Sequence, residues 1–268
     1  NCFEVYASGR TPNPCVLCNP LIKFGLLIDY AKSIGAAALL TGHYAKFSGD
    51  GLIVRGDDPK KDQSYFLYRL DRAMLDFIDF PVGNMQKSQV RAMAAAANIS
   101  VANRTDSQVA CFVFPGETFA ETLYRRFNGK AQPGNFIYQG KTVGKHPGIH
   151  RCTIGQRKGL NVALGVPAYV KNIDAESSNV ELVTDQTLLE KQEFEISNIN
   201  FQTPQIPDEN EDLLIQIRYR TPPAPGRLIK IDNDRCRIIL NTPMRAITPG
   251  QSAVIYRENT LLGGGIIL

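Results

Sequence analysis

The spacing of hydrophobic residues changes along this chain, from a helical period in the first third to short alternating runs in the rest. Apolar residues recur at helical spacing over 21–34, which predicts a helix that ends at Gly35. The apolar run 36–41 predicts a short buried parallel strand. Other patterns predict helices over 63–70, 73–78, 88–97 (with Ser88 as its N-cap) and 117–127, and a hairpin over 44–47 and 52–55. These elements predict an α/β domain.

Beyond about residue 130, Gly and Pro punctuate short segments rich in strand-forming residues. Strands are predicted over 168–171, 180–183, 194–196, 214–220, 227–231, 236–240, 252–256 and 261–267. The run Gly263-Gly264-Gly265 fits a bulge or tight bend within the last of them. Five or six short strands at regular spacing predict that the chain ends in a small β-barrel or sandwich.

Composition narrows the class of protein. The chain has 268 residues, 43% of them hydrophobic and 21% charged, which is ordinary for a globular protein with a sizeable core. Six cysteines are too few for a disulfide scaffold at this length, so we expect a cytoplasmic protein with reactive thiols or a metal. We expect no signal peptide and no membrane partner. The net charge of +4 is compatible with an RNA partner.

The candidate chemistry begins with two cysteines, Cys15 and Cys18, and a distant third, Cys111. A C-x-x-C can be a redox dithiol, half of a metal site, or a nucleophile with a helper. The apolar run after Asn19 places the pair at or just before a helix N-terminus, which would lower a thiol pKa. The alternative is a pair of buried structural cysteines. A zinc site would need a second ligand pair, and the sequence has no second C-x-x-C.

Seven separated motifs then carry a resemblance that runs from Gly9 to Ile267. In order they are GRTPNPCVLCN (9–19), TGHY (41–44), KDQSYFL (61–67), Asp106-Ser107 leading to Cys111-Phe112, TIGQRKGL (153–160), RYR (218–220) and TPGQSAV (248–254). The chain resembles the bacterial and organellar tRNA-specific 2-thiouridylases of the MnmA/TrmU family. The resemblance implies an α/β domain of the PP-loop, adenine-nucleotide α-hydrolase-like type over 1–116, a small central domain over 117–194, and a tRNA-binding C-terminal β-barrel over 195–268.

The resemblance also implies an activity. Enzymes of this family use ATP with Mg²⁺ to adenylate the C2 oxygen of the wobble uridine in tRNA, and replace that oxygen with sulfur carried as a cysteine persulfide. A sulfur-relay or cysteine-desulfurase protein would donate the sulfur. Matched motif by motif, the implied roles are nucleophile for Cys18, persulfide carrier for Cys111, ATP binding for Gly42, target-base contact for Asn13, Pro14 and Cys15, and tRNA contact for His43, Lys61, Asp62, Gln63, Arg218, Tyr219 and Gln251.

Physical chemistry is compatible with these roles but leaves alternatives open. If 214–220 is a strand, Arg218 and Arg220 share one face and Tyr219 lies on the other, which suits phosphate contact and base stacking; the alternative is an exposed charged strand face. For His43 the alternative is a core or turn histidine. Cys2, Cys152 and Cys236 belong to no motif and are interpreted as structural.

Three departures from the family pattern affect the interpretation. The family's pyrophosphatase loop, S-G-G-x-D-S-S, is missing, and the chain begins at Asn1 rather than Met, so we expect a truncated piece that cannot activate uridine alone. Val109-Ala110 replaces the usual Gly-Ile before Cys111. Some members carry Asp where this chain has Cys15, so Cys15, Cys18 and Cys111 could instead ligate a [4Fe-4S] cluster. A non-catalytic tRNA-binding remnant of the enzyme is the other alternative.

Overall fold

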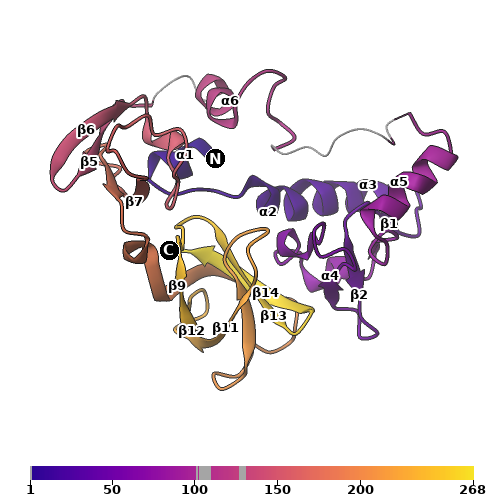
Figure 1. Ribbon diagram of the computed structural model, residues 1–268. Helices are drawn as coiled ribbons and strands as arrows, with labels where there is room; N and C mark the ends of the chain where they lie inside the picture. Colours follow the sequence, from indigo (N-terminus) through magenta and orange to yellow (C-terminus); the bar gives the residue numbers. More distant parts are fainter. Residues whose placement is uncertain (1, 101, 103–109, 127–130) are drawn as a thin grey trace.

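The computed structural model describes residues 2–100, 102, 110–126 and 131–268. Three bodies are visible in Figure 1: a first domain of helices and short strands, a central sheet domain, and a C-terminal barrel. The first helix, α1 (Cys2–Ala7), packs on the central domain through Phe3 and Tyr6, which share a core cluster with Leu123. An extended segment then crosses to the first domain (Figure 1).

The first domain is built around one helix of 20 residues, Pro14–Ser33, that combines two helical geometries. It consists of α2 (Pro14–Cys18), the π-helix η1 (Asn19–Leu26) and α3 (Leu27–Ser33). The prediction that the helix begins near residue 21 was therefore wrong, because Pro14 opens it, as proline readily does in a first turn. Gly25 makes the wide turn possible, since a Cβ there would lie 2.6 Å from the Pro20 carbonyl oxygen.

Two short strand pairs complete this domain together with two helices. Strand β1 (Leu39–Leu40) pairs in parallel with β4 (Ile78–Asp79), and β2 (Ala45–Phe47) forms the predicted hairpin with β3 (Ile53–Arg55). The helix predicted over 63–70 is only a 3-10 turn, η2 (Ser64–Phe66). The helix predicted over 73–78 is α4 (Arg72–Leu75), which ends before β4. Helix α5 (Lys87–Ala96) is capped by Gln86 in a reciprocal pair with Gln89, so Ser88 is not the N-cap.

The central domain is a four-stranded sheet with a helix beside it. The sheet order is β6-β5-β8-β7, and its core includes Phe136, Val170 and Leu182. Its elements are α6 (Phe119–Arg126), β5 (Gly134–Tyr138), β6 (Lys141–His146), the 3-10 turn η3 (Ile149–Arg151), β7 (Tyr169–Ile173), β8 (Val180–Val183) and the 3-10 turn η4 (Gln186–Leu189).

The C-terminal part is a closed barrel of six strands in the order β13-β10-β11-β12-β9-β14, with β13 pairing back to β14. These strands are β9 (Glu190–Phe201), β10 (Leu213–Gln216), β11 (Ala224–Lys230), β12 (Cys236–Arg245), β13 (Ser252–Arg257) and β14 (Thr260–Ile267). The expected α/β, central and barrel order is confirmed. The pairing of β14 with β9 shifts register between Gly264 and Ile266, at the glycine run. The first-domain strand β3 joins this sheet at Val54, opposite Thr260.

The long helix presents an apolar face that no described residue covers. Seven large apolar side chains of the helix and its surroundings are between 46% and 65% exposed: Leu21, Ile22, Leu26, Leu27, Tyr30, Ile34 and Leu40. The strand prediction for 36–41 was therefore wrong about burial, because Leu40 is among them. By length and mean hydropathy (1.2), Pro14–Ser33 could cross a membrane, but here Phe24, Ile28 and Ala31 pack it into the first domain's interior.

Candidate active site and RNA-binding surface

The two helix cysteines lie one turn apart at the beginning of the long helix. Asn13 is the extended residue before the helix, Cys15 lies in the first turn, and Cys18 ends α2. A spacing of three residues puts both thiols on the same side of a helix. The Cys15 side chain is exposed and that of Cys18 is half-buried, whereas Val16 between them is fully buried. The prediction that the two thiols lie at a helix N-terminus is confirmed, and the alternative of two buried structural cysteines was wrong.

Electrostatic surroundings do not make Cys15 a stabilised thiolate. Partial burial raises the pKa of the Cys15 thiol, the ammonium of Lys23 opposes that shift, and Cys111 and Cys18 raise the pKa further. The prediction that the helix N-terminus lowers this pKa was wrong, because desolvation outweighs it. The third motif cysteine, Cys111, is exposed, and Cys2 also acts to raise the pKa of Cys15. Asp106, Ser107 and Val109 lie outside the described residues.

The donor set for a metal is incomplete within the residues that the structure describes. No three Cys, His, Asp or Glu side chains among them converge closely enough to hold an ion. Cys15, Cys18 and Cys111 therefore do not fit an iron–sulfur cluster as arranged here.

The TGHY motif follows the carboxyl end of β1, as predicted. Gly42 faces open space, because a Cβ there would meet no atom within 4 Å, which suits close approach of a ligand. His43 instead points into the interior, where its ring lies 5.5 Å from that of Phe24 and its Nδ1 lies 2.8 Å from the Thr41 hydroxyl. Burial, assisted by Lys23, lowers the pKa of His43 to about 4. His43 is thus buried and neutral near pH 7, and its contact with tRNA stays a prediction.

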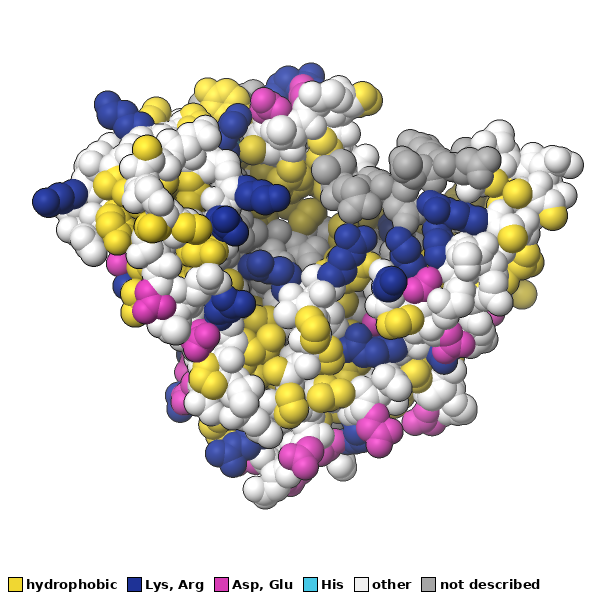
Figure 2. All heavy atoms as spheres, in the orientation of Figure 1, with side chains coloured by type: hydrophobic (Ala, Val, Ile, Leu, Met, Phe, Trp, Pro, Cys, Tyr) yellow, Lys and Arg dark blue, Asp and Glu magenta, His cyan; other side chains and the backbone are white. Residues whose placement is uncertain are grey.

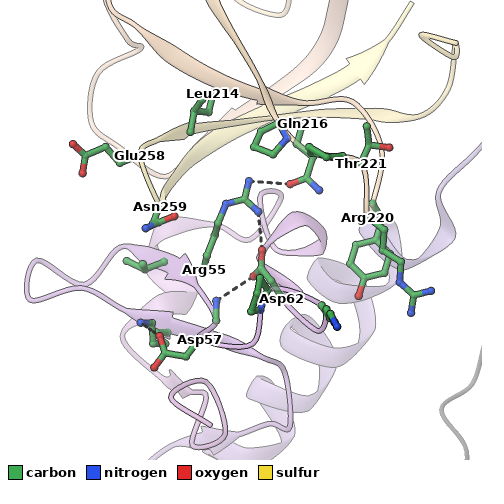
Figure 3. A pocket seen from close by; sticks show the side chains of 17 residues that line it. Arg55, Asp57, Asp62, Leu214, Gln216, Arg220, Thr221, Glu258 and Asn259 are labelled. Carbon is green, nitrogen blue, oxygen red and sulfur yellow. Dashed lines mark hydrogen bonds and ion pairs between the residues drawn. The ribbon is translucent and has the colours of Figure 1, made fainter. Parts of the chain in front are cut away.

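Two residues of the KDQ motif, Asp62 and Gln63, hydrogen-bond within the protein, and Figure 3 shows Asp62. The buried Asp62 carboxylate accepts from the Arg55 guanidinium at 2.8 Å, and from the backbone of Gly56 and Ser64 at 3.2 and 3.1 Å. The Gln63 amide oxygen accepts from the Tyr44 N–H and so braces the TGHY turn. Lys61, the first residue of the motif, is half-buried.

A cavity of about 590 Å³ opens beside this network, between the hairpin β2–β3 and the barrel. Figure 3 shows Arg55 at its floor, reaching Asp62 on one side and Gln216 on the other, at 2.8 and 2.9 Å. Arg220 and Thr221 line the opposite rim. Sequence reasoning missed Arg55, because a lone arginine in a short hairpin carries no motif.

The RYR motif is not a strand. Strand β10 ends at Gln216, residues 218–220 form a bend and turn, and Arg220 has a left-handed φ of +64°. The alternating-face prediction was therefore wrong. Arg218 turns inward and donates to the Thr248 hydroxyl at 2.7 Å, and burial lowers its pKa. Tyr219 packs its ring 4.5 Å from that of Phe66 and remains half-buried beside the cavity.

The segment that leads into the cysteine helix is held by both other domains, and we call residues 9–13 the strap. The Thr11 N–H donates to the Pro249 carbonyl at 2.8 Å. The Gln251 amide donates to the carbonyls of Thr11 and Pro12 at 3.0 and 3.3 Å. The Thr11 hydroxyl donates to that of Thr153 in the central domain at 3.3 Å. The sequence motifs contain all these residues, but only the fold shows that they meet.

Basic side chains gather around the hollow between the first and central domains. Figure 2 shows Lys and Arg clustered about this hollow, whereas acidic side chains lie mostly toward the edges of the view. Such a one-sided distribution raises the local concentration of a polyanion.

Comparison with known families agrees with the three bodies. Residues 1–115 match a family described as "tRNA methyl transferase HUP domain", residues 122–184 a "tRNA methyl transferase PRC-barrel domain", and residues 191–267 an "Aminomethyltransferase beta-barrel domain". Together these segments take up most of the chain.

Curated relatives match along the whole chain. A "tRNA-specific 2-thiouridylase MnmA" of Trichlorobacter lovleyi is 41% identical over 273 residues, covering 100% of this chain and 76% of the relative. One from Carboxydothermus hydrogenoformans is 40% identical, covering 98% and 73%. "MnmA 2" of Clostridium botulinum is 39% identical, covering 99% and 76%. With this identity over nearly its full length, the chain belongs to the tRNA-specific 2-thiouridylase (MnmA) family.

Proposed function

We propose that this protein is a tRNA-uridine 2-sulfurtransferase that uses ATP to activate the wobble uridine and a cysteine persulfide as the sulfur source. Membership of the MnmA family is the observation that carries the proposal. It is supported by the exposed Cys15 and half-buried Cys18 at the beginning of the long helix and by the exposed Cys111. The open space at Gly42, after β1, is compatible with a nucleotide at the carboxyl edge of the first-domain strands.

In the proposed reaction, the uridine C2 oxygen attacks the α-phosphate of ATP and pyrophosphate leaves, so that a poor leaving group becomes a good one. The terminal sulfur of a Cys111 persulfide then attacks C2, and AMP leaves with the original oxygen. Cys18, as thiolate, attacks the Cys111 sulfur, the persulfide S–S bond breaks, and 2-thiouridine is released from a Cys18–Cys111 disulfide. A dithiol reductant must reopen that disulfide before the next turnover.

The partners follow from this chemistry. The tRNA would lie across the basic hollow, with its target base near Asn13, Pro14 and Cys15 at the beginning of the cysteine helix. A sulfur-relay or cysteine-desulfurase protein would load Cys111, whose exposed side chain is accessible to a second protein. We also propose a cytoplasmic location, because the relatives are named as enzymes that modify tRNA.

The test is complementation of a bacterial strain that lacks its own thiouridylase, using the full open reading frame that encodes this chain. Digested tRNA is analysed for 2-thiouridine by mass spectrometry. We expect the wild-type protein to restore the nucleoside, Cys111→Ser and Cys18→Ser to abolish it, and Cys2→Ser, outside every motif, to retain it. Normal thiolation in Cys111→Ser would refute the persulfide assignment.

The same experiment separates the alternatives. A non-catalytic RNA-binding protein would bind tRNA in a filter assay but restore no 2-thiouridine in any variant. An iron–sulfur enzyme would lose thiolation in Cys15→Ala together with stoichiometric iron and acid-labile sulfide after anaerobic purification. The persulfide relay instead requires no iron and an added sulfur mass on Cys111.

A further inference from the structure

The position of the cysteine helix is set from outside its own domain. Its first residues follow directly from the strap, and Thr11 and Pro12 in the strap are buried. The residues that Gln251 contacts, Thr11 and Pro12, directly precede Asn13 and Pro14, where the helix begins. A displacement of the strap is therefore transmitted directly to Cys15.

The barrel contacts the strap so closely at Gly250 and Thr11 that no additional side-chain atom fits between them. Gly250 has φ +89°, and a Cβ there would lie 2.9 Å from both the N and the O of Thr11. The loop that carries Gly250 and Gln251 is itself fixed, because the Gly250 N–H donates to the Ile267 carbonyl and the Ile267 N–H to the Gln251 carbonyl, both at 2.8 Å. Gln251 thus extends from a rigid base.

The strap presents two carbonyl oxygens to the barrel, and each of them needs a hydrogen-bond donor. The carbonyls of Thr11 and Pro12 are acceptors, and the Gln251 amide nitrogen is their side-chain donor. We propose that Gln251 is a positioning residue, whose amide holds Thr11 and Pro12 so that the barrel fixes Cys15 and Cys18 for reaction. This inference deepens the proposed function, since those thiols belong to its site, but the arrangement can be probed without tRNA, ATP or sulfur.

The test measures alkylation of the thiols in the protein without RNA. Gln251→Glu keeps the shape of the side chain but presents oxygen to both carbonyls. We expect the half-buried Cys18 to react with iodoacetamide about fivefold faster, the change expected when one hydrogen bond that holds the strap in place is lost. Peptide mass spectrometry assigns the modified cysteine, and the affinity for tRNA should change less than twofold.

Gln192 offers a matched control in the same barrel. Its amide nitrogen also donates to two consecutive carbonyls, those of Leu240 and Asn241, at 2.9 and 3.4 Å, away from the strap. Gln192→Glu should leave the alkylation rate unchanged. Equal acceleration in both variants would overturn the proposal, since a general effect of the added charge would then suffice.

The remaining outcomes also decide. Unchanged alkylation with weakened tRNA binding would make Gln251 a direct RNA contact and overturn the positioning role. Loss of the near-UV circular dichroism signal in Gln251→Glu would show that this variant does not fold. Gln251→Met, which is uncharged and of similar length, is then used instead, and the same alkylation rate and tRNA affinity are expected for it. Should the protein prove inactive in thiolation, faster alkylation would still support the positioning of the thiols while the proposed function fails; if it is active, kcat should fall with KM for tRNA unchanged.

Discussion

The guanidinium of Arg55, in the first domain, lies over the ring of Tyr256, in the barrel, with its central carbon 3.7 Å from the ring centroid. The same guanidinium is paired with Asp62, and the Tyr256 hydroxyl reaches Ser64, which also donates to Asp62. The two domains are therefore joined by a closed polar network with an aromatic floor. Networks of this kind are stable only when every member is satisfied.

Loss of the charge on Asp62 should destabilise this junction. Asp62→Asn leaves the Arg55 guanidinium, only 18% exposed, without its anionic partner. We expect the free energy of unfolding to fall by about 2–4 kcal/mol. Urea unfolding followed by circular dichroism measures it. Asp57→Asn is the control: it removes an exposed partner of Lys46 beside the same cavity and should cost less than about 1 kcal/mol.

A small loss in Asp62→Asn, equal to that in Asp57→Asn, would contradict a structural role for Asp62. The carboxylate would then be available for the RNA contact that the sequence motif suggested.

Acid should destabilise the folded protein through His43. Its pKa is about 4 in the folded state against an ordinary 6.5, so below pH 6.5 the unfolded chain binds a proton that the folded protein does not. Stability from this residue is complete above pH 6.5 and is lost as the pH falls toward 4. We expect His43 to account for about 2–3 kcal/mol of the loss between pH 7 and 4.5.

His43→Gln supplies the comparison, since glutamine does not titrate. Urea unfolding at a series of pH values should give a shallower acid dependence for the variant. Parallel curves for the two proteins would mean that His43 titrates normally and is accessible to solvent or RNA.

The close approach of Gly250 to Thr11 predicts an unusually costly alanine. Gly250→Ala must accommodate both a left-handed φ and a Cβ at 2.9 Å from the Thr11 backbone. Gly140, with φ +74° and no atom within 4 Å of its Cβ position, isolates the first effect. Thermal unfolding should show a loss of about 1–2 kcal/mol for Gly140→Ala and a clearly larger one for Gly250→Ala. Equal losses would mean that the barrel loop moves away freely.

Binding of tRNA should depend on salt, and Lys61 should carry part of that dependence. Lys61→Ala is expected to reduce the slope of log Kd against log salt by about 1, the contribution of one phosphate contact. Filter binding at several salt concentrations measures the slope. Lys171→Ala removes a lysine of β7 that belongs to none of the seven sequence motifs, and it should leave the slope unchanged. An unaltered slope for Lys61→Ala would place this residue outside the RNA interface.

Local period and turn residues predicted the α/β beginning of the chain, its strand-rich end and the hairpin β2–β3, whereas the order of three bodies was implied by the family resemblance. Sequence reasoning failed where tertiary geometry decides. Alternation in Arg218-Tyr219-Arg220 imitates a strand, but the segment turns ahead of Pro222 and Pro223. The KDQ motif identified Asp62, but its partner Arg55 is brought to it by the tertiary fold, and the spacing of residues in the sequence does not indicate this contact. Likewise, burial of His43 depends on Phe24 and Phe80, which are distant in sequence.

The π-helical segment after Cys18 changes the direction in which the thiols point relative to the buried face of the same helix. Each residue of an α-helix advances by about 100°, so the thiols and the buried face of Phe24, Ile28 and Ala31 would otherwise have one fixed angular relation. The wide turn, permitted by Gly25, sets the thiols at a different angle around the helix axis, while the rest of the helix remains packed. A regular helix of the same composition would keep the domain core and turn the reactive sulfurs to another side.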